Sequence, residues 1–136
     1  MELINRFNRQ KDDFERLVVM LRADSGIQRI DEDWTAPSDP SRIGISKERL
    51  ATYRQLFKKL GIPRGIEVVH QPECITFIAS SIGLSISGSA KGYAYLEEPP
   101  QLVVDNLDTY WSANGQSFTA FKHIKGDWYL FFDYED

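Results

Sequence analysis

The sequence predicts an α+β fold in which two N-terminal helices pack on an antiparallel meander sheet of about five or six strands. Three observations predict this class: helical spacing of apolar residues in the first 60 positions, short β-type runs from residue 65 onward, and turn signals between those runs. The length of 136 residues suits one domain. We expect a helical part, residues 1–62, and a sheet part, residues 63–136.

Two segments carry the helical pattern. The first runs from Leu3 toward Gly26 as one long amphipathic helix or two shorter ones. The second, residues 47–60, is better marked, because Ser46 is a suitable N-cap and Gly61 provides a left-handed C-cap. Between them, aspartates and prolines predict a linker with a short extended piece around residues 30–34.

The second half of the chain predicts strands separated by turns. The expected strands cover residues 66–70, 74–80, 84–89, 93–96, 109–111, 118–124 and 128–134, with a turn around Lys91-Gly92 between residues 89 and 93. The last is apolar on both faces and should be central or covered on both sides. Asn114-Gly115 and Gly126-Asp127 predict turns, and residues 101–110 predict a short helix.

Composition narrows the classes of function. No apolar run is long enough for a bilayer, and the N-terminus lacks the apolar stretch of a secretion signal, so we expect a cytoplasmic protein without membrane contact. The single cysteine, Cys74, excludes an intramolecular disulfide and a cysteine-clustered zinc site. We therefore expect no metal and no cofactor.

Catalytic motifs are weak in this sequence. Cys74 with His70 or His123 is the one pairing that suggests a thiol nucleophile and its base, but a lone cysteine in an apolar strand usually packs as a small hydrophobic side chain. The serines between residues 80 and 89 fit neither a nucleophile elbow nor a phosphate loop. We assign no catalytic residue.

Charge is divided unevenly along the chain. Residues 1–96 carry 14 basic and 12 acidic side chains, whereas residues 97–136 carry 2 and 8, a net charge of −6. Residues 42–64 hold seven bases against Glu48 alone. An overall pI near 5.2 and the absence of a nucleic-acid-binding motif nevertheless argue against a nucleic acid partner.

The acidic, aromatic C-terminal third is the predicted partner-binding surface. Aromatic side chains anchor interfaces, and carboxylates steer a basic partner toward them. The candidate residues are Glu97, Glu98, Asp105, Asp108, Tyr110 and Trp111.

Three stretches of the sequence resemble a family of small bacterial proteins with no assigned activity. They are Tyr53-Arg54-Gln55-Leu56-Phe57-Lys58-Lys59-Leu60-Gly61-Ile62, Ser87-Gly88-Ser89-Ala90-Lys91-Gly92-Tyr93 and His123-Ile124-Lys125-Gly126-Asp127-Trp128-Tyr129-Leu130. The resemblance covers most of the chain from about Trp34. It implies a compact bacterial accessory protein of the toxin-immunity kind, and it brings no catalytic residue.

The leading hypothesis is a binding protein without catalysis, an immunity or inhibitor protein that masks a basic toxin or enzyme. The alternative is a small-molecule-binding or hydrolytic enzyme with a pocket between helices and sheet, near Cys74, His70 or His123. A structural subunit of a homodimer or larger homo-oligomer is a third option.

Overall fold

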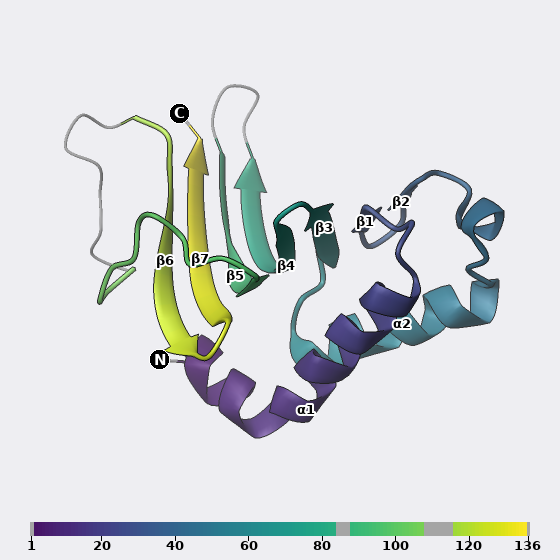
Figure 1. Ribbon diagram of the computed structural model, residues 1–136, viewed down its shortest axis with the longest axis horizontal. Helices are drawn as coiled ribbons and strands as arrows, with labels where there is room; N and C mark the ends of the chain where they lie inside the picture. The colour runs from purple at the N-terminus through teal and green to yellow at the C-terminus, as the bar shows by residue number, and fades with distance from the viewer. Residues whose placement is uncertain (1, 84–87, 108–115, 136) are drawn as a thin grey trace.

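The computed structural model describes residues 2–83, 88–107 and 116–135 and confirms the α+β class (Figure 1). The helices are α1 (Glu2–Ala23), the short 3-10 helix η1 (Pro40–Ile43) and α2 (Lys47–Leu60). The strands are β1 (Arg29–Ile30), β2 (Thr35–Ala36), β3 (Ile66–His70), β4 (Glu73–Gly83), β5 (Gly88–Leu96), β6 (Phe118–Lys125) and β7 (Trp128–Glu135). The described part of the sheet therefore has seven strands, a little more than predicted, and all neighbours are antiparallel.

Helix α2 has the predicted bounds because its caps are local. The Ser46 hydroxyl accepts a hydrogen bond from the Arg49 amide at 3.0 Å, which satisfies one of the free donors of the first turn. Gly61 follows the last turn with φ of 69°, a conformation that glycine adopts without strain. Helix α1 bends at Gln10, whose backbone is not helical.

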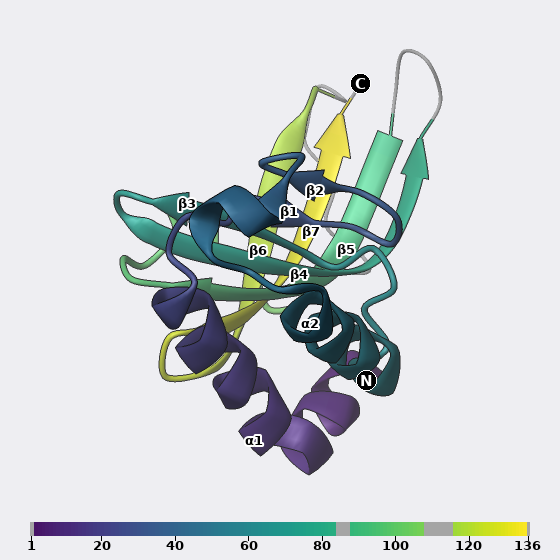
Figure 2. The ribbon, with the colours of Figure 1, turned by 90° about the vertical axis from the view of Figure 1, so that its right-hand side faces the viewer.

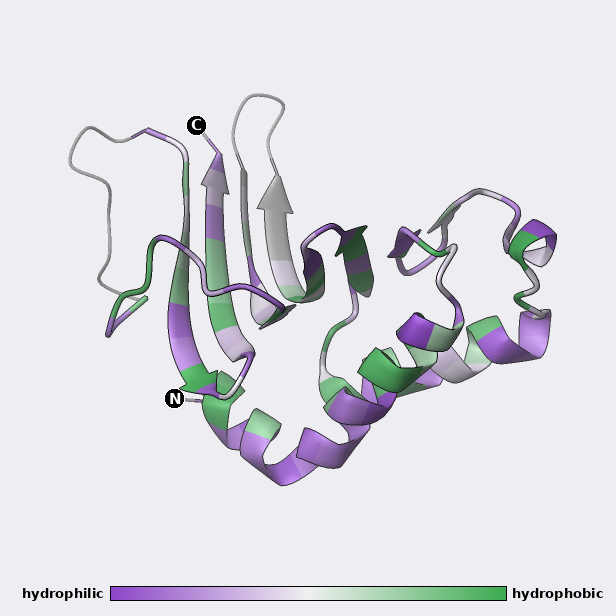
Figure 3. Cartoon of the chain, viewed as in Figure 1, coloured by the Kyte–Doolittle hydropathy of each residue, from purple (hydrophilic) through white to green (hydrophobic). Residues whose placement is uncertain are grey.

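Both helices cover the same side of the sheet, beneath it in the view of Figure 2. Buried residues of α1 and α2 form one core with the facing side chains of the strands, and its centre is the aromatic cluster Phe7, Phe14, Phe77, Tyr93 and Trp128. Figure 3 shows that the side of α1 turned away from the sheet is largely hydrophilic. Neither α1 nor α2, within the described ranges, is long and apolar enough to cross a membrane.

The predicted meander holds only for β3, β4 and β5. The turn predicted around Lys91-Gly92 is wrong, because both residues pair with β4 on one side and with β7 on the other, inside β5. The strand order is β2-β1-β3-β4-β5-β7-β6, so the chain passes from β5 to the far edge as β6 and then returns between them as β7. The central position expected for the last strand is confirmed. Trp128 and Leu130 of β7 belong to the main core, whereas Tyr129 and Phe131 pack in a second apolar cluster on the opposite face.

Strands β1 and β2 lie inside the part of the chain that the sequence predicted as helical. The short extended piece expected around residues 30–34 overlaps this two-strand ribbon only at Ile30, because residues 31–34 connect β1 to β2. Arg29 pairs with Ala36 on one side and with Glu67 on the other. Two-residue strands carry no periodicity of their own, and pairing with β3 stabilises them.

The helix predicted at residues 101–110 is wrong for residues 101–107, which the structure describes. The Val104 amide donates to the Phe121 carbonyl at 2.7 Å, and the Phe121 amide donates to the Leu102 carbonyl at 2.9 Å. Val103 thereby forms a parallel bridge beside β6, and the segment occupies an otherwise open edge of the sheet. The strand expected at residues 109–111, the Asn114-Gly115 turn and residues 84–87 lie outside the described residues.

Candidate protein-binding surface

Four acidic residues from three separate segments lie at one end of the sheet. We call Glu73, Glu97, Glu98 and Asp127 the acidic corner. The Glu97 amide donates to the Glu73 carbonyl at 2.9 Å, which joins the end of β5 to the start of β4. The Leu96 amide donates to the Asp127 carbonyl at 3.0 Å, which joins the same end of β5 to the β6–β7 turn.

One arginine partly neutralises the acidic corner. Arg22, in the last turn of α1, donates to both carboxylate oxygens of Glu73, at 3.2 and 2.7 Å. This hydrogen bonding holds the pKa of Glu73 below its ordinary value against the opposing effect of burial, and the same carboxylate raises the pKa of Arg22. Neither Glu98 nor Asp127 forms an ion pair with a described residue, so the corner keeps an excess of negative charge.

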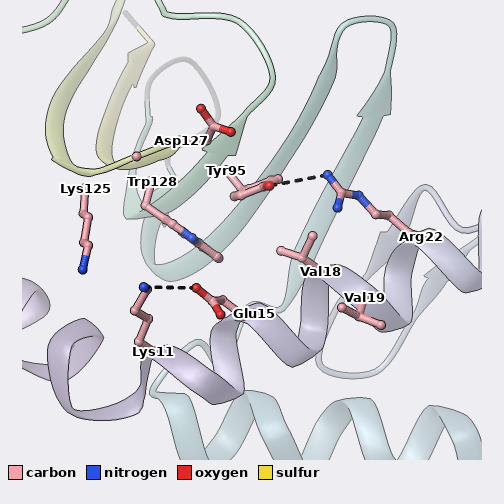
Figure 4. A pocket seen from close by; sticks show the side chains of 10 residues that line it. Lys11, Glu15, Val18, Val19, Arg22, Tyr95, Lys125, Asp127 and Trp128 are labelled. Atoms are coloured by element: carbon pink, nitrogen blue, oxygen red, sulfur yellow. Dashed lines mark hydrogen bonds and ion pairs between the residues drawn. The ribbon is translucent and has the colours of Figure 1, made fainter.

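A groove of about 370 Å³ adjoins the acidic corner, between α1 and the ends of β5 and β7 (Figure 4). Its apolar lining comes from Val18, Val19, Tyr95 and Trp128. Val19 is 66% exposed, so an apolar side chain is open to a partner at the rim. The Trp128 ring packs against Phe7 at 5.1 Å between centroids and Tyr95 at 4.9 Å, which makes this wall rigid.

Charged side chains mark the two ends of the groove. Figure 4 shows Lys11 and Lys125 at one end and Arg22 at the other, with the Trp128 indole between them. Lys11 is paired with Glu15 at 3.3 Å, and Arg22 is paired with Glu73. The groove therefore combines an apolar wall, two neutralised cations, the additional positive charge of Lys125 and the nearby carboxylates of the acidic corner.

The six predicted partner-binding residues have different positions. Glu97 and Glu98 belong to the acidic corner. Asp105 lies elsewhere: it follows the Val103 bridge on the outer side of β6, where its carbonyl accepts from Lys122 Nζ at 2.6 Å. Asp108, Tyr110 and Trp111 lie outside the described residues.

Glu73 and the α1 side of the groove were not predicted as parts of this surface, and Asp127, although it belongs to the acidic C-terminal third, was not among the six candidate residues. Glu73 and Arg22 are 51 positions apart, and no local pattern links them. The one available signal was the tight turn at Gly126-Asp127, which places Asp127 at an exposed tip beside the aromatic strand.

The thiol and the two histidines are not brought together. Cys74 pairs with Val69 across β3 and β4, so His70, one position further, points to the opposite face of the sheet. His123 lies on β6, with β5 and β7 between it and β4, and its Nε2 lies 2.9 Å from the Gly126 carbonyl. Burial, aided by the charge of Glu67, raises the pKa of the Cys74 thiol, which keeps it protonated at neutral pH.

Within residues 2–83, 88–107 and 116–135, no group of three or more His, Cys, Asp and Glu residues is placed to hold a metal ion. The bases of residues 42–64 are largely paired with acids from the preceding segment. The ion pairs are Arg42–Asp39, Arg49–Asp24, Lys59–Asp13 and Arg64–Asp31. Much of the positive charge of residues 42–64 is thus neutralised by ion pairs in the folded protein.

The stretches that support the family resemblance fall on α2, β5 and the β6–β7 hairpin. Each contains a structurally demanding glycine. A side chain at Gly92, for example, would place its Cβ 1.9 Å from the Phe77 carbonyl oxygen of the neighbouring strand. Comparison of the chain with protein-family models, with curated proteins and with solved structures found no match.

Proposed function

We propose that this chain is a non-catalytic protein-binding module of the immunity or inhibitor kind, which masks a basic toxin or enzyme. One observation supports the proposal above the others: the acidic corner stands next to an apolar groove. Interfaces of this kind combine buried aromatic or aliphatic anchors with a charged rim. A partner with an exposed apolar side chain flanked by lysine or arginine would complement both features.

The two features have different roles in such a complex. Glu98 and Asp127 are exposed, so their charge acts on the approach of the partner and raises the association rate. The groove is lined by Val19 and by the rigid Trp128 and Tyr95 rings, so burial there slows dissociation. Little ordering of the wall is needed on binding, because its aromatic side chains already pack against the core.

The alternative function, an enzyme with a pocket between helices and sheet, has less support. Apart from the groove at its edge, the space between the helices and the sheet is filled by the aromatic cluster around Phe14 and Tyr93. Cys74, His70 and His123 do not form a nucleophile and base with each other. A second copy of the chain is the other candidate occupant of the groove, and the experiment below distinguishes it by sizing the free protein.

The test uses the products of the genes adjacent to the one that encodes this chain. Each product is co-expressed with the chain, and both binding and rescue of host growth are measured. We expect one basic product to bind and its toxicity or activity to be suppressed. Recovery of no partner, together with unaltered toxicity on co-expression, would refute the proposal. Elution of the free chain as a dimer would favour the homodimer instead.

A charge-reversal pair locates the surface. The double variant Glu98→Lys with Asp127→Lys should lower the association rate by roughly tenfold at low salt, with a smaller effect at high salt. The matched control is Asp12→Lys with Asp33→Lys, which makes the same change in net charge at two exposed positions away from the corner. Equal effects of the two double variants would show that only net charge matters.

A further inference from the structure

A second hollow lies beside the C-terminal half of α2, away from the groove. It has a volume of about 530 Å³ and is lined by Glu32, Arg54, Phe57, Lys58, Gly61 and Pro63. We call it the α2 pocket. Arg54 and Lys58 are four positions apart on the helix, so they stand on the same face and both border the pocket.

The cations of the α2 pocket are free to bind a ligand. Arg54 uses Nε to donate to the Asp31 carbonyl at 3.2 Å, which fixes the guanidinium while its terminal nitrogens bond no described residue. Lys58 is exposed, and its ammonium likewise forms no ion pair within the described part of the chain. Glu32 is the one acid among the lining residues. The residues that line the α2 pocket thus carry a net positive charge.

The surroundings do not cancel this positive charge. Asp31, whose carbonyl contacts Arg54, has its carboxylate already paired with Arg29 and Arg64. The last carbonyls of α2, which would repel an anion, have donors: Gly61 N–H bonds the Lys58 carbonyl, and Gln10 Nε2 bonds the Lys59 carbonyl. The Arg6 guanidinium also packs against Gly61, because a Cβ built there would lie 1.6 Å from its Nη1.

The floor of the α2 pocket is apolar. Pro63 is exposed and supplies the open apolar surface, Gly61 has no side chain, and the Phe57 ring, 2% exposed, lies just beneath. An inorganic ion would leave this floor uncovered. A ligand with both a charged group and an apolar body would use the whole site.

We propose that the α2 pocket binds a small organic anion, a phosphate monoester or a carboxylate on an apolar body about the size of an aromatic ring. Arg54 offers a planar fork of donors to the anionic group, Lys58 adds a second charge, and the apolar body rests on Pro63, above the buried Phe57 ring. This inference concerns a different face from the acidic corner and does not depend on the proposed partner.

The test is a titration of the intact protein followed by nuclear magnetic resonance at the Phe57 and Gly61 amides. Phenyl phosphate, benzoate, inorganic phosphate and phenol are the four probes. We expect phenyl phosphate or benzoate to bind with a dissociation constant on the order of 1 mM, as ligand efficiency allows for so few atoms. Inorganic phosphate and phenol should each bind much more weakly, because each lacks one half of the ligand. Equal binding of phenol would refute the role of charge.

Variants assign the binding to the pocket. Lys58→Gln changes an exposed residue and should weaken phenyl phosphate or benzoate binding roughly fivefold, as expected for a partly exposed charged contact. Arg54→Gln should weaken it at least as much, and Lys58→Gln keeps the test valid if loss of the Asp31 contact unfolds that variant. The control, Lys47→Gln, removes the same charge from the other end of α2. An equal loss in the control, or no shift of either amide with any organic probe, would overturn the proposal.

Discussion

Asp31 is the one charged side chain among the fully buried residues that the structure describes, and its removal gives a sharp test of the fold. It is 2% exposed and lies just after β1, where it pairs with Arg29 and Arg64 and accepts the Glu32 amide at 2.6 Å. Burial opposes its ionisation, but the hydrogen bonds from Arg29 and from that amide outweigh it, so the pKa of Asp31 is lowered.

The stability that Asp31→Ala should lose follows from the arginines that the substitution leaves without their carboxylate. Breaking a fully buried ion pair costs about 3–5 kcal/mol, because a charge is stranded without a partner. The Arg29 side chain is only 13% exposed, so water cannot replace its lost partner and Arg29 accounts for most of the destabilisation. Arg64 is 46% exposed and can be hydrated. We therefore expect the lower part of the range, about 3 kcal/mol, lost from the free energy of unfolding.

The double variant Asp31→Leu with Arg29→Met separates charge from packing. Replacing both members of a buried pair by apolar groups is often close to neutral, so this variant should recover at least half of the loss. Methionine keeps a flexible side chain to pack where Arg29 now lies over the Trp34 ring. Full recovery is not expected, because the Glu32 amide loses its acceptor in both variants.

Urea unfolding followed by circular dichroism measures both variants. With a slope of about 1.5 kcal/mol per molar urea, a loss of about 3 kcal/mol moves the midpoint by about 2 M. A loss below about 1 kcal/mol for Asp31→Ala, or a double variant no more stable than the single one, would refute the reasoning that a stranded Arg29 is the cause.

Three further predictions use the same measurement. Phe14→Ala, which removes a ring 4.6 Å from Tyr93 between centroids, should cost about 4 kcal/mol and Phe14→Leu about 1 kcal/mol; similar costs would contradict the tight aromatic packing. Ser46→Ala should cost about 1 kcal/mol through the lost cap, and an unchanged midpoint would mean that another group caps α2. The folded-state pKa values of Glu73 and Asp31 lie below their ordinary values of 4.5 and 3.8, so their contribution is complete above those values and is lost as the pH falls through the lowered ones. Glu73→Gln should therefore show a smaller loss of stability on acidification than the unchanged protein, and identical pH profiles would contradict this assignment.

Elements specified by neighbouring residues could be predicted, and those specified by distant pairing could not. The bounds of α2 follow from Ser46 and Gly61, and β3 was predicted to the residue from its own composition. By contrast, residues 102–104 pair with β6 because that strand offers an open edge, and this pairing overrides the helical spacing of Val103 and Leu107. Strands β1 and β2 are too short to have a pattern at all.

Pairing between distant residues also explains why only part of the candidate surface was predicted from the sequence. In a simple meander β6 would run antiparallel to β5, and the β6–β7 turn would lie at the opposite end of the sheet from Glu97. Because β7 lies between them, β5 and β6 run in the same direction, and the turn brings Asp127 beside the end of β5. Strand order, which is fixed by non-local packing, therefore decides which acids meet.

The fold also changes what the uneven charge along the chain means for a partner. Four of the seven bases of residues 42–64 pair with acids of residues 13–39, and of the remaining three, Arg54 and Lys58 border the α2 pocket. The acidic corner also has few unneutralised charges, because Arg22 neutralises Glu73. The negative charge that remains there is chiefly that of Glu97, Glu98 and Asp127. The α2 pocket and the acidic corner thus each hold only a few unneutralised charges. Their electrostatic field is screened over a Debye length of about 10 Å at 0.1 M salt. A basic partner would feel the acidic corner only at close approach, so contact in the groove, more than long-range attraction, must supply most of its affinity.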